Sequence, residues 1–327
     1  MTTPRPLGAT GLMVTSIGLG LAAVGRPAYI DLGRDSDLGP DRSVEAMRHL
    51  THGLLDAAYD AGVRYVDTAR SYGLAERFLG SWLARHGRRA GDPTVGSKWG
   101  YRYVGDWRLD APAHEVKDHS LAALESQYAE SRAELGDRLL LYQIHSATLE
   151  SGVLEDAAVL GALDRLRRGG LVIGLTASGP GQADLIRRAL DVRVDGECLF
   201  GSVQATWNLL EGSVGPALAD AHQAGLGVIL KEVLANGRLS GYGAVGGTPL
   251  SDIAERAGVG TDAVAIAAAM ANPWVDVVLS GAVGASQLKS NLEALSVRLS
   301  LADLDALRAL TESPERYWSE RQALRWS

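Results

Sequence analysis

Hydrophobic and polar positions in this chain of 327 residues follow two alternating periodicities. Short apolar runs bounded by turn residues predict buried strands, and apolar positions that recur every three or four residues predict amphipathic helices. The predicted strands span 16–20, 63–67, 94–98, 138–145, 171–176, 200–205, 227–231 and 275–280. The predicted helices span 44–61, 74–86, 115–135, 154–168, 181–190 and 214–224. Eight strands that alternate with helices are typical of an α/β fold closed as a (β/α)8 TIM barrel, rather than of an open sheet.

The two ends of the chain add elements to this barrel. Leu7-Gly8 and 12–14 flank Ala9-Thr10-Gly11, a pattern that predicts an N-terminal β-hairpin. After the last strand, a helix over 286–295 is followed by leucines at helical spacing from Leu301 to Leu310. The aromatic tail is expected to pack across the body of the protein or its site. No tract resembles a linker, so we expect a single domain over 1–327.

Three connections are longer than the usual few residues, and each follows a predicted strand. They span 24–42, 99–113 and 234–248. In a TIM barrel, connections after strands lie on the face where active sites are built. The second is rich in aromatic residues, which is unusual for a purely solvated loop. We therefore predict that Trp99, Tyr101 and Trp107 line a substrate pocket, although a surface loop is the simpler alternative.

Composition narrows the class of protein. The net charge of −7 is modest and spread along the chain, which argues against nucleic acid or an anionic membrane surface as partner. No apolar run approaches the roughly 20 residues that span a bilayer, and the N-terminus lacks the apolar core of a signal peptide. Cys198 is the only cysteine, so a disulfide within the chain or a thiolate metal cluster is impossible. We expect a soluble, cytoplasmic protein without a metal site, either a monomer or a small homo-oligomer.

Polar residues that could take part in catalysis stand at the ends of successive predicted strands. Asp67 ends the second predicted strand, Tyr72 lies in the following turn, Lys98 ends the third strand and His145 ends the fourth. Each alone has a simpler interpretation: a turn cap, a core tyrosine, a solvated lysine and a buried histidine. Because neighbouring strands bring their ends together, we expect the four to converge. A phenol with a pKa of about 10 donates its proton poorly at neutral pH unless a cation stabilises the phenolate, and Lys98 is a candidate for that cation.

These residues and several further motifs resemble the aldo-keto reductases along essentially the whole chain. The motifs that carry the resemblance are Leu7-Gly8 with Thr10-Gly11-Leu12, Asp67-Thr68-Ala69 with Tyr72-Gly73 and Glu76, Ser97-Lys98, Gln143-Ile144-His145, Gln204 with Asn208-Leu209-Leu210, and Gly281-Ala282 with Gln287-Leu288 and Asn291. Several separated motifs in the same order are far more specific than any one alone.

The resemblance implies a role for each residue of the cluster. Tyr72 would be the general acid that protonates a carbonyl oxygen, or the base in the reverse oxidation. Lys98 would stabilise its phenolate, Asp67 would hold Lys98, and His145 would bind and orient the substrate oxygen. Since no side chain carries a hydride, the resemblance also implies a nicotinamide dinucleotide, NAD(P)(H), as cofactor.

The implied contacts to the nicotinamide depart from the family pattern in two places. Thr176 and Gln204 match contacts to the carboxamide, but the usual asparagine beside the first is Ala177 here. Where many relatives place an aromatic ring against the nicotinamide, this chain has Lys231. The lysine would then lie near the nicotinamide, the substrate or the pyrophosphate; the alternative is a surface pair with Glu232.

The remaining cofactor residues imply a weak site for a 2′-phosphate. Gly20, in a Gly-x-Gly-x-x-Ala sequence with no helix directly after it, would border the nicotinamide, and Gly237 with Arg238 would approach the pyrophosphate. The last motif offers no charge to a 2′-phosphate, and Asn291 would meet the adenine. The uncharged residues of that motif are Gly281, Ala282, Val283 and Gln287. This arrangement favours NADH slightly over NADPH.

The sequence thus predicts an NAD(P)(H)-dependent oxidoreductase. It would reduce an aldehyde or ketone to an alcohol, or oxidise the matching alcohol or sugar, and its partner would be a small carbonyl or sugar-like molecule. The alternative is a nicotinamide-binding regulatory or auxiliary subunit with little catalysis, and the departures at Ala177 and Lys231 support that alternative.

Overall fold

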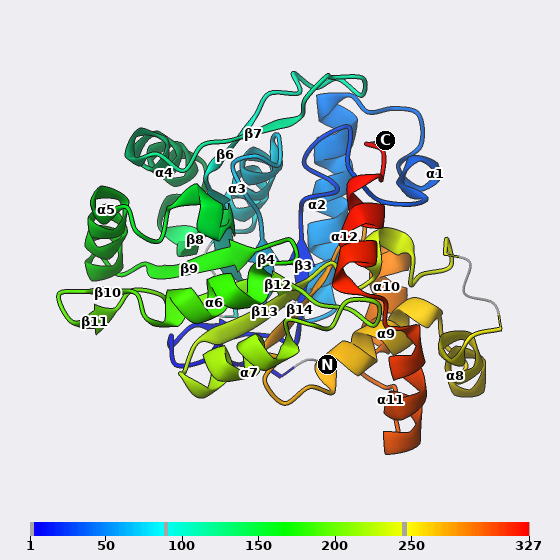
Figure 1. Ribbon diagram of the computed structural model, residues 1–327. Coiled ribbons are helices and arrows are strands. Elements are labelled where there is room, and N and C mark those ends of the chain that lie inside the picture. The colour runs from blue at the N-terminus through cyan, green and yellow to red at the C-terminus, as the bar shows by residue number, and fades with distance from the viewer. Residues whose placement is uncertain (1–2, 88–90, 244–246, 327) are drawn as a thin grey trace.

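The computed structural model describes residues 3–87, 91–243 and 247–326. Residues 244–246, part of the predicted connection 234–248, lie outside the described residues. Eight parallel strands form a closed barrel, which confirms the predicted fold (Figure 1). In chain order these strands are β3 (Ile17–Gly20), β4 (Tyr65–Asp67), β5 (Thr94–Trp99), β8 (Leu139–Ala147), β9 (Val172–Ala177), β12 (Ser202–Thr206), β13 (Gly227–Lys231) and β14 (Val277–Ser280).

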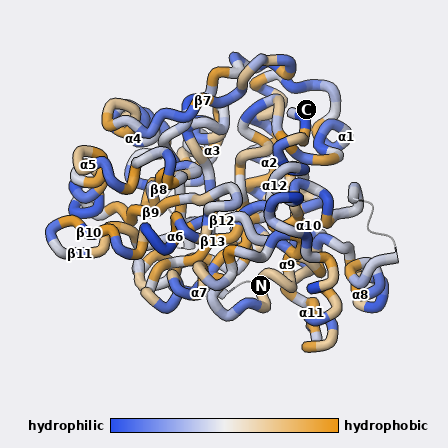
Figure 2. Tube along the Cα trace, in the orientation of Figure 1, coloured by the Kyte–Doolittle hydropathy of each residue, from blue (hydrophilic) through white to orange (hydrophobic). Residues whose placement is uncertain are grey.

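Helices surround the barrel, and α4, α5, α6, α7 and α9 pack directly against its strands. In Figure 2 the barrel strands are largely hydrophobic, whereas α5 alternates between hydrophilic and hydrophobic residues, as a helix with one solvated face does. The helices after the barrel strands are α2 (Val44–Asp60), α3 (Ala75–His86), α4 (Leu121–Leu135), α5 (Ala157–Arg168), α6 (Gln182–Leu190), α7 (Gly215–Gln223), α8 (Pro249–Ala257), α9 (Thr261–Met270) and α10 (Ala285–Glu293).

The other elements lie in the connections and at the two ends. Helix α1 (Arg34–Leu38) lies in the first long connection, and α11 (Leu301–Leu307) and α12 (Pro314–Gln322) follow the barrel. The short strands are β1 (Arg5–Pro6), β2 (Met13–Val14), β6 (Tyr101–Tyr103), β7 (Glu115–Lys117), β10 (Arg193–Val194) and β11 (Glu197–Cys198). Single 3₁₀ turns are η1 (Gly136–Arg138), η2 (Leu149–Ser151), η3 (Ala235–Gly237) and η4 (Arg308–Leu310).

The N-terminal hairpin of β1 and β2 closes the amino-terminal end of the barrel. Leu7 and Val14 are fully buried there and pack with Ile229 and Val277 from the barrel strands. A Cβ atom on Gly8 would lie 2.4 Å from the backbone nitrogen of Gly227, so the close approach of the hairpin requires a glycine. The predicted hairpin is confirmed, and it leaves the opposite end of the barrel for the site.

The predicted helix 115–135 is wrong over its first residues. Glu115–Lys117 forms strand β7, which pairs antiparallel with β6, and α4 begins only at Leu121. The Ser120 hydroxyl accepts a hydrogen bond from the Ala123 backbone nitrogen and so caps the helix start. The aromatic connection is therefore a two-stranded ribbon and not a loop without regular structure.

Two helices lie between strands β13 and β14, a segment in which no helix was predicted. Residues from Ala263 to Ala269 in α9 are all buried. A helix that is apolar on every side has no amphipathic stripe, so periodicity does not reveal it. Helix α8 begins with the Thr248 cap and Pro249, signals that identify a helix start.

Candidate active site

A cavity of about 880 Å³ opens at the carboxyl ends of the barrel strands. Its volume lies within the range of about 300–1,000 Å³ that is usual for small-molecule sites. We call the part beside Tyr72 and His145 the catalytic end and the part beside Gln287 and Asn291 the far end. The C-terminal tail contributes Arg321 and Trp326 to the wall, which confirms that the tail packs across the site.

Lys98 is the centre of the polar contacts at the catalytic end. It extends from β5, is fully buried, and forms an ion pair with Asp67 from β4. Its Nζ also donates to the carbonyl oxygen of Thr68 at 3.0 Å and lies 3.3 Å from the hydroxyl of Tyr72. Burial lowers the pKa of Lys98, and the charge of Asp67 opposes that shift. The predicted convergence of carboxylate, ammonium and phenol is therefore present in the structure.

The carboxylate of Asp67 is oriented by several donors. Its Oδ1 accepts from Gln204 Nε2 at 2.9 Å, from Tyr65 Oη at 3.2 Å and from Gln143 Nε2 at 3.4 Å. These side chains come from three different barrel strands, so the fold holds the carboxylate in one position. Gln204 lines the cavity as predicted, and its amide nitrogen is used on Asp67.

Tyr72 is held in its protonated form. Burial raises the pKa of Tyr72 well above its ordinary value, the charges of Asp67 and Glu115 raise it further, and Arg26 lowers it. The Arg26 guanidinium lies 5.2 Å from the centre of the Tyr72 ring and is paired with Glu115 at 2.6 Å. The phenol therefore keeps its proton at neutral pH and does not show the lowered pKa that the sequence led us to expect. The Lys98 ammonium is nevertheless in contact with the oxygen that would become negative when the proton is donated.

His145 lies edge-on to the Tyr72 ring, with ring centres 5.4 Å apart. Its Nδ1 is 3.3 Å from the hydroxyl of Ser71. Burial lowers the pKa of His145 well below its ordinary value, and the cations Lys98 and Lys231 lower it further. A neutral imidazole can form a hydrogen bond to a substrate oxygen without competing with Tyr72 as the acid.

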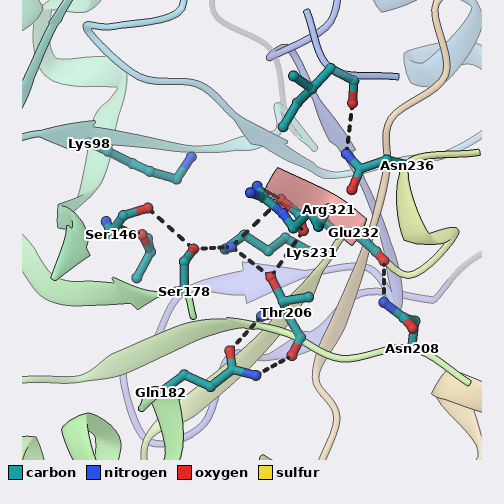
Figure 3. Close-up of polar contacts among 12 residues, drawn as sticks. Lys98, Ser146, Ser178, Gln182, Thr206, Asn208, Lys231, Glu232, Asn236 and Arg321 are labelled. Atoms are coloured by element: carbon teal, nitrogen blue, oxygen red, sulfur yellow. Dashed lines mark hydrogen bonds and ion pairs between the residues drawn. The ribbon is translucent and has the colours of Figure 1, made fainter. Parts of the chain in front are cut away.

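Lys231 at the end of β13 lies at the floor of the cavity. Its Nζ donates to Ser178 Oγ at 2.7 Å and to Thr206 Oγ1 at 2.8 Å (Figure 3). Glu232 is nearly buried and pairs with Arg321 of α12, and its carboxylate is 4.0 Å from Lys231. Lys231 and Glu232 thus form an ion pair, as in the alternative, but both side chains are largely buried, so the pair does not lie at the surface.

Backbone turns explain how these strand ends present their side chains. Ser146 follows His145 and Glu232 follows Lys231, and both have positive φ angles, 45° and 55°. Non-glycine residues adopt this left-handed conformation rarely and cluster at functional sites. In β8 this conformation coincides with the register shift between Ile144 and Ala147, and both Ser146 and Glu232 line the cavity.

The predicted cofactor residues divide into two groups. Those that line the cavity are Gly20, Gln204, Lys231, Gly237, Gly281, Ala282, Gln287 and Asn291. Thr176 is fully buried below the floor, where its hydroxyl accepts from the Ser146 backbone nitrogen at 2.7 Å. Arg238 pairs with Glu312 and Glu320 and does not line the cavity. The expected contacts of Thr176 and Arg238 with a cofactor are not supported by these positions.

The aromatic pocket residues are also placed differently from the prediction. Trp99 is fully buried in the core because it follows Lys98 on β5, and successive side chains on a strand point to opposite faces. Trp107 packs against Phe78, and its indole nitrogen donates to the Arg42 carbonyl. Tyr101 lies 5.1 Å from the ring of His145 but faces a smaller, separate pocket. Trp99 and Trp107 do not line the cavity.

Sequence reasoning missed several residues of the site. Arg26 is enclosed by the rings of Tyr29, Tyr72 and Trp326, at 5.1, 5.2 and 4.8 Å from their centres. Gln143 could have been found, because it lies two positions before His145 on the same strand and therefore on the same face. Arg26 carries no local signal, since long-range packing alone brings it to Tyr72, whereas Trp326 belongs to the aromatic tail that was expected to pack across the body or the site.

The far end of the cavity is acidic or neutral. Asp37 of α1 accepts from Gln287 Nε2 at 2.5 Å and from the Tyr242 hydroxyl, and so joins the first connection to α10. Arg34, a cation of the first connection that lines the cavity, donates to the carbonyl oxygens of Ala23, Arg26 and Pro27. Helix α10 begins at the cavity without a side-chain cap, which leaves its first backbone N–H groups available to an anion. An elongated cavity with an uncapped helix start fits a dinucleotide.

Within 3–87, 91–243 and 247–326, no cluster of three or more metal-ligating side chains is found. No helix in the same ranges is long and apolar enough to cross a membrane.

A closed (β/α)8 barrel with an ion-paired lysine in contact with a tyrosine at its carboxyl end defines an acid–base site in a TIM-barrel protein. The model of the aldo/keto reductase family matches residues 17–312, so the chain belongs to this family. This membership supports an oxidoreductase that acts on carbonyl compounds.

Known proteins are similar to this chain along most of its length. An uncharacterised oxidoreductase, YrpG of Bacillus subtilis, is 26% identical over 346 aligned positions, which cover 95% of this chain and 98% of the relative. A pyridoxal 4-dehydrogenase of Microbacterium luteolum is 26% identical and covers 72% of each chain. The holo form of an aldo-keto reductase from Bacillus halodurans has the same fold, with a TM-score of 0.71, 22% identity, and coverage of 96% of this chain and 97% of its own.

Proposed function

We propose that this protein is an NADH-dependent oxidoreductase that reduces the carbonyl group of a small aldehyde or ketone, or oxidises the corresponding alcohol or sugar. The proposal rests on the 3.3 Å contact between Lys98 Nζ and Tyr72 Oη, beside His145 at one end of a cavity that fits a dinucleotide. Family membership and the pyridoxal 4-dehydrogenase activity named for one relative support the same class of reaction.

Each residue of the catalytic end has one task in this proposal. The bound nicotinamide supplies the hydride. Tyr72 donates its proton to the carbonyl oxygen, and the Lys98 ammonium stabilises the phenolate that remains. Asp67 fixes the position of Lys98, and neutral His145 orients the substrate oxygen. In the oxidation direction the same phenolate takes the proton back from the alcohol.

The far end of the cavity supports NADH over NADPH. The 2′-phosphate would approach Asp37, whose carboxylate already accepts from Gln287 and Tyr242. Arg34, the cation closest to Asp37 in the chain, is only 1% exposed and bonded to backbone carbonyls. A phosphate placed there would meet a like charge without a cation that is free to turn toward it.

The first experiment is a screen of purified protein with NADH or NADPH against aldehydes and ketones, followed by the absorbance of the reduced nicotinamide. Tyr72→Phe is expected to reduce turnover by about 10²–10⁴-fold, because general acid catalysis contributes that much. Cofactor affinity should stay within about tenfold, or about 1.4 kcal/mol. Tyr142→Phe is the matched control, since Tyr142 is buried on β8 and packs on Tyr128 of α4, away from the cavity.

Two outcomes would contradict the proposal in different ways. Full activity of Tyr72→Phe would remove the phenol from the mechanism. Tight binding of NADH without turnover of any carbonyl compound in a wide screen would favour the nicotinamide-binding auxiliary subunit.

A further inference from the structure

Lys231 is a cation at the catalytic end that the acid–base chemistry described above does not use. Its side chain is 15% exposed, lines the cavity, and reaches it from the carboxyl end of β13. Two of its three N–H groups are directed to the neutral hydroxyls of Ser178 and Thr206 (Figure 3). No step that involves Tyr72, Lys98 or His145 requires a second ammonium group at this position.

Lys231 gives the catalytic end a net positive charge. The other charged groups there form three ion pairs: Asp67 with Lys98, Glu115 with Arg26, and Glu232 with Arg321. His145 is neutral because burial and neighbouring cations lower its pKa. Within the part of the chain that the structure describes, four cations therefore face three carboxylates at this end. Lys231 is the cation whose nearest recorded carboxylate, Glu232 at 4.0 Å, already holds another partner.

The position of Lys231 places this charge next to the hydride donor of the proposed function, on which this inference rests. A hydride donor must lie within about 3–3.5 Å of the carbonyl carbon, whose oxygen would meet Tyr72 and His145. Ser146 follows His145, its hydroxyl is 3.4 Å from Ser178 Oγ, and Ser178 accepts from Lys231. A nicotinamide ring placed beside such a carbonyl would therefore lie over the part of the cavity floor that contains the Lys231 ammonium.

We propose that Lys231 sets the preference of the site between the two oxidation states of the nicotinamide. The oxidised ring is cationic and the reduced ring is neutral, so a fixed positive charge beside the ring weakens binding of NAD⁺ and leaves binding of NADH nearly unchanged. In a partly buried site, two like charges a few ångströms apart change affinity by at least about tenfold. The protein thereby binds NADH in preference to NAD⁺ and releases NAD⁺ readily after a carbonyl is reduced.

The test is a pair of binding titrations without substrate, with tryptophan fluorescence as the readout. Wild-type protein is expected to bind NADH more tightly than NAD⁺. Lys231→Met should lower the ratio of the two Kd values by about tenfold, equivalent to about 1.4 kcal/mol, because NAD⁺ gains affinity. Lys231→Arg keeps the charge and should keep the ratio. Lys289→Met, which removes an exposed charge on α10, is the matched control and should change nothing.

A pH series on the unmodified protein tests the same inference without any substitution. Burial lowers the pKa of Lys231 to about 8; Glu232 and Asp67 oppose this shift, and Arg321 and Lys98 add to it. The ratio of Kd values should therefore fall as pH rises from about 7 to 9 and the ammonium loses its charge. His145 and Tyr72 do not interfere, since their pKa values are displaced away from this window in opposite directions. Asp31 lines the same cavity and has a pKa of about 7, so the same pH series on Lys231→Arg, which keeps its charge, is needed to isolate the contribution of Lys231.

The outcomes separate the inference from the function on which it rests. An unchanged ratio in Lys231→Met, or a ratio that does not vary with pH in wild-type protein, would overturn the role of Lys231 and leave the oxidoreductase proposal intact. Failure of the wild-type protein to bind either nucleotide would overturn both.

Discussion

The two ends of the cavity are built from different parts of the fold. At the catalytic end, Asp67, Lys98 and His145 lie on barrel strands, and side chains from other barrel strands hold Asp67 and Lys98 in position. At the far end, the lining comes from the first connection, the connection after β13 and the start of α10, and a bridge from Asp37 to Gln287 joins them. Strand register thus determines the chemistry, whereas contacts between connections determine which nucleotide fits.

The largest loss of activity is expected when the buried ion pair between Asp67 and Lys98 is removed. The double variant Asp67→Asn/Lys98→Met removes the cation beside Tyr72 without leaving an unpaired buried carboxylate, which would itself destabilise the fold. We expect kcat/KM to fall by about 10²–10⁴-fold, since the phenolate loses its stabilising charge. Steady-state kinetics measures the loss, and an NADH titration that stays within about tenfold of wild type shows that the far end is intact. Turnover near the wild-type rate would rule out Lys98 as the group that activates Tyr72.

A smaller effect, on the preference between NADPH and NADH, is expected from a substitution at the far end. Asp37→Asn keeps a hydrogen-bonding side chain between Gln287 and Tyr242 but removes the charge. The ratio of Kd for NADPH to Kd for NADH should fall by about tenfold, about 1.4 kcal/mol, with kcat unchanged. Fluorescence titrations with both nucleotides measure this ratio. Asp35→Asn on the same helix is the control, since Asp35 pairs with Arg42 and does not line the cavity. A ratio that is equal in both variants would show that Asp37 does not face the 2′-position.

The last effect concerns stability and not activity, and it arises in the first connection. Burial raises the pKa of Asp31 to about 7, and Arg34 opposes the shift. Because the folded-state pKa lies above the unfolded value of about 3.9, the contribution of Asp31 to stability is fully present below that value and is lost as pH rises through about 7. Urea unfolding between pH 5 and 8 should show this decline, which for one group is at most about 1.4 kcal/mol per pH unit. Asp31→Asn should flatten it, and the same slope in both proteins would contradict the assignment.

The barrel could be predicted from the sequence because the chain repeats the alternation of strand and helix eight times. The sequence was also sufficient for Tyr72 and Lys98, since a residue at the end of a parallel strand has a predictable position. It was misleading for Trp99, where the alternation of side chains along β5 decides the outcome: Lys98 faces inward, so Trp99 must face the helices.

The residues that the sequence did not reveal depend on contacts between distant segments. Arg26 meets Trp326 across 300 positions of chain, and Glu115 reaches Arg26 only because β7 pairs with β6. Helix α9 was missed for a different reason, because its alanines are buried on all sides and show no period. Patterns within one segment predict strands and helices, but they contain no information on which connections pack together.

The position of the C-terminal tail has a practical consequence for handling the protein. Trp326 stacks on His114 and covers Arg26, and Arg321 is anchored to Glu232 beside the cavity floor. A bulky label introduced at Trp326 would stand in the wall of the cavity. The hairpin of β1 and β2 lies at the opposite end of the barrel, so purification handles and labels belong at the amino terminus.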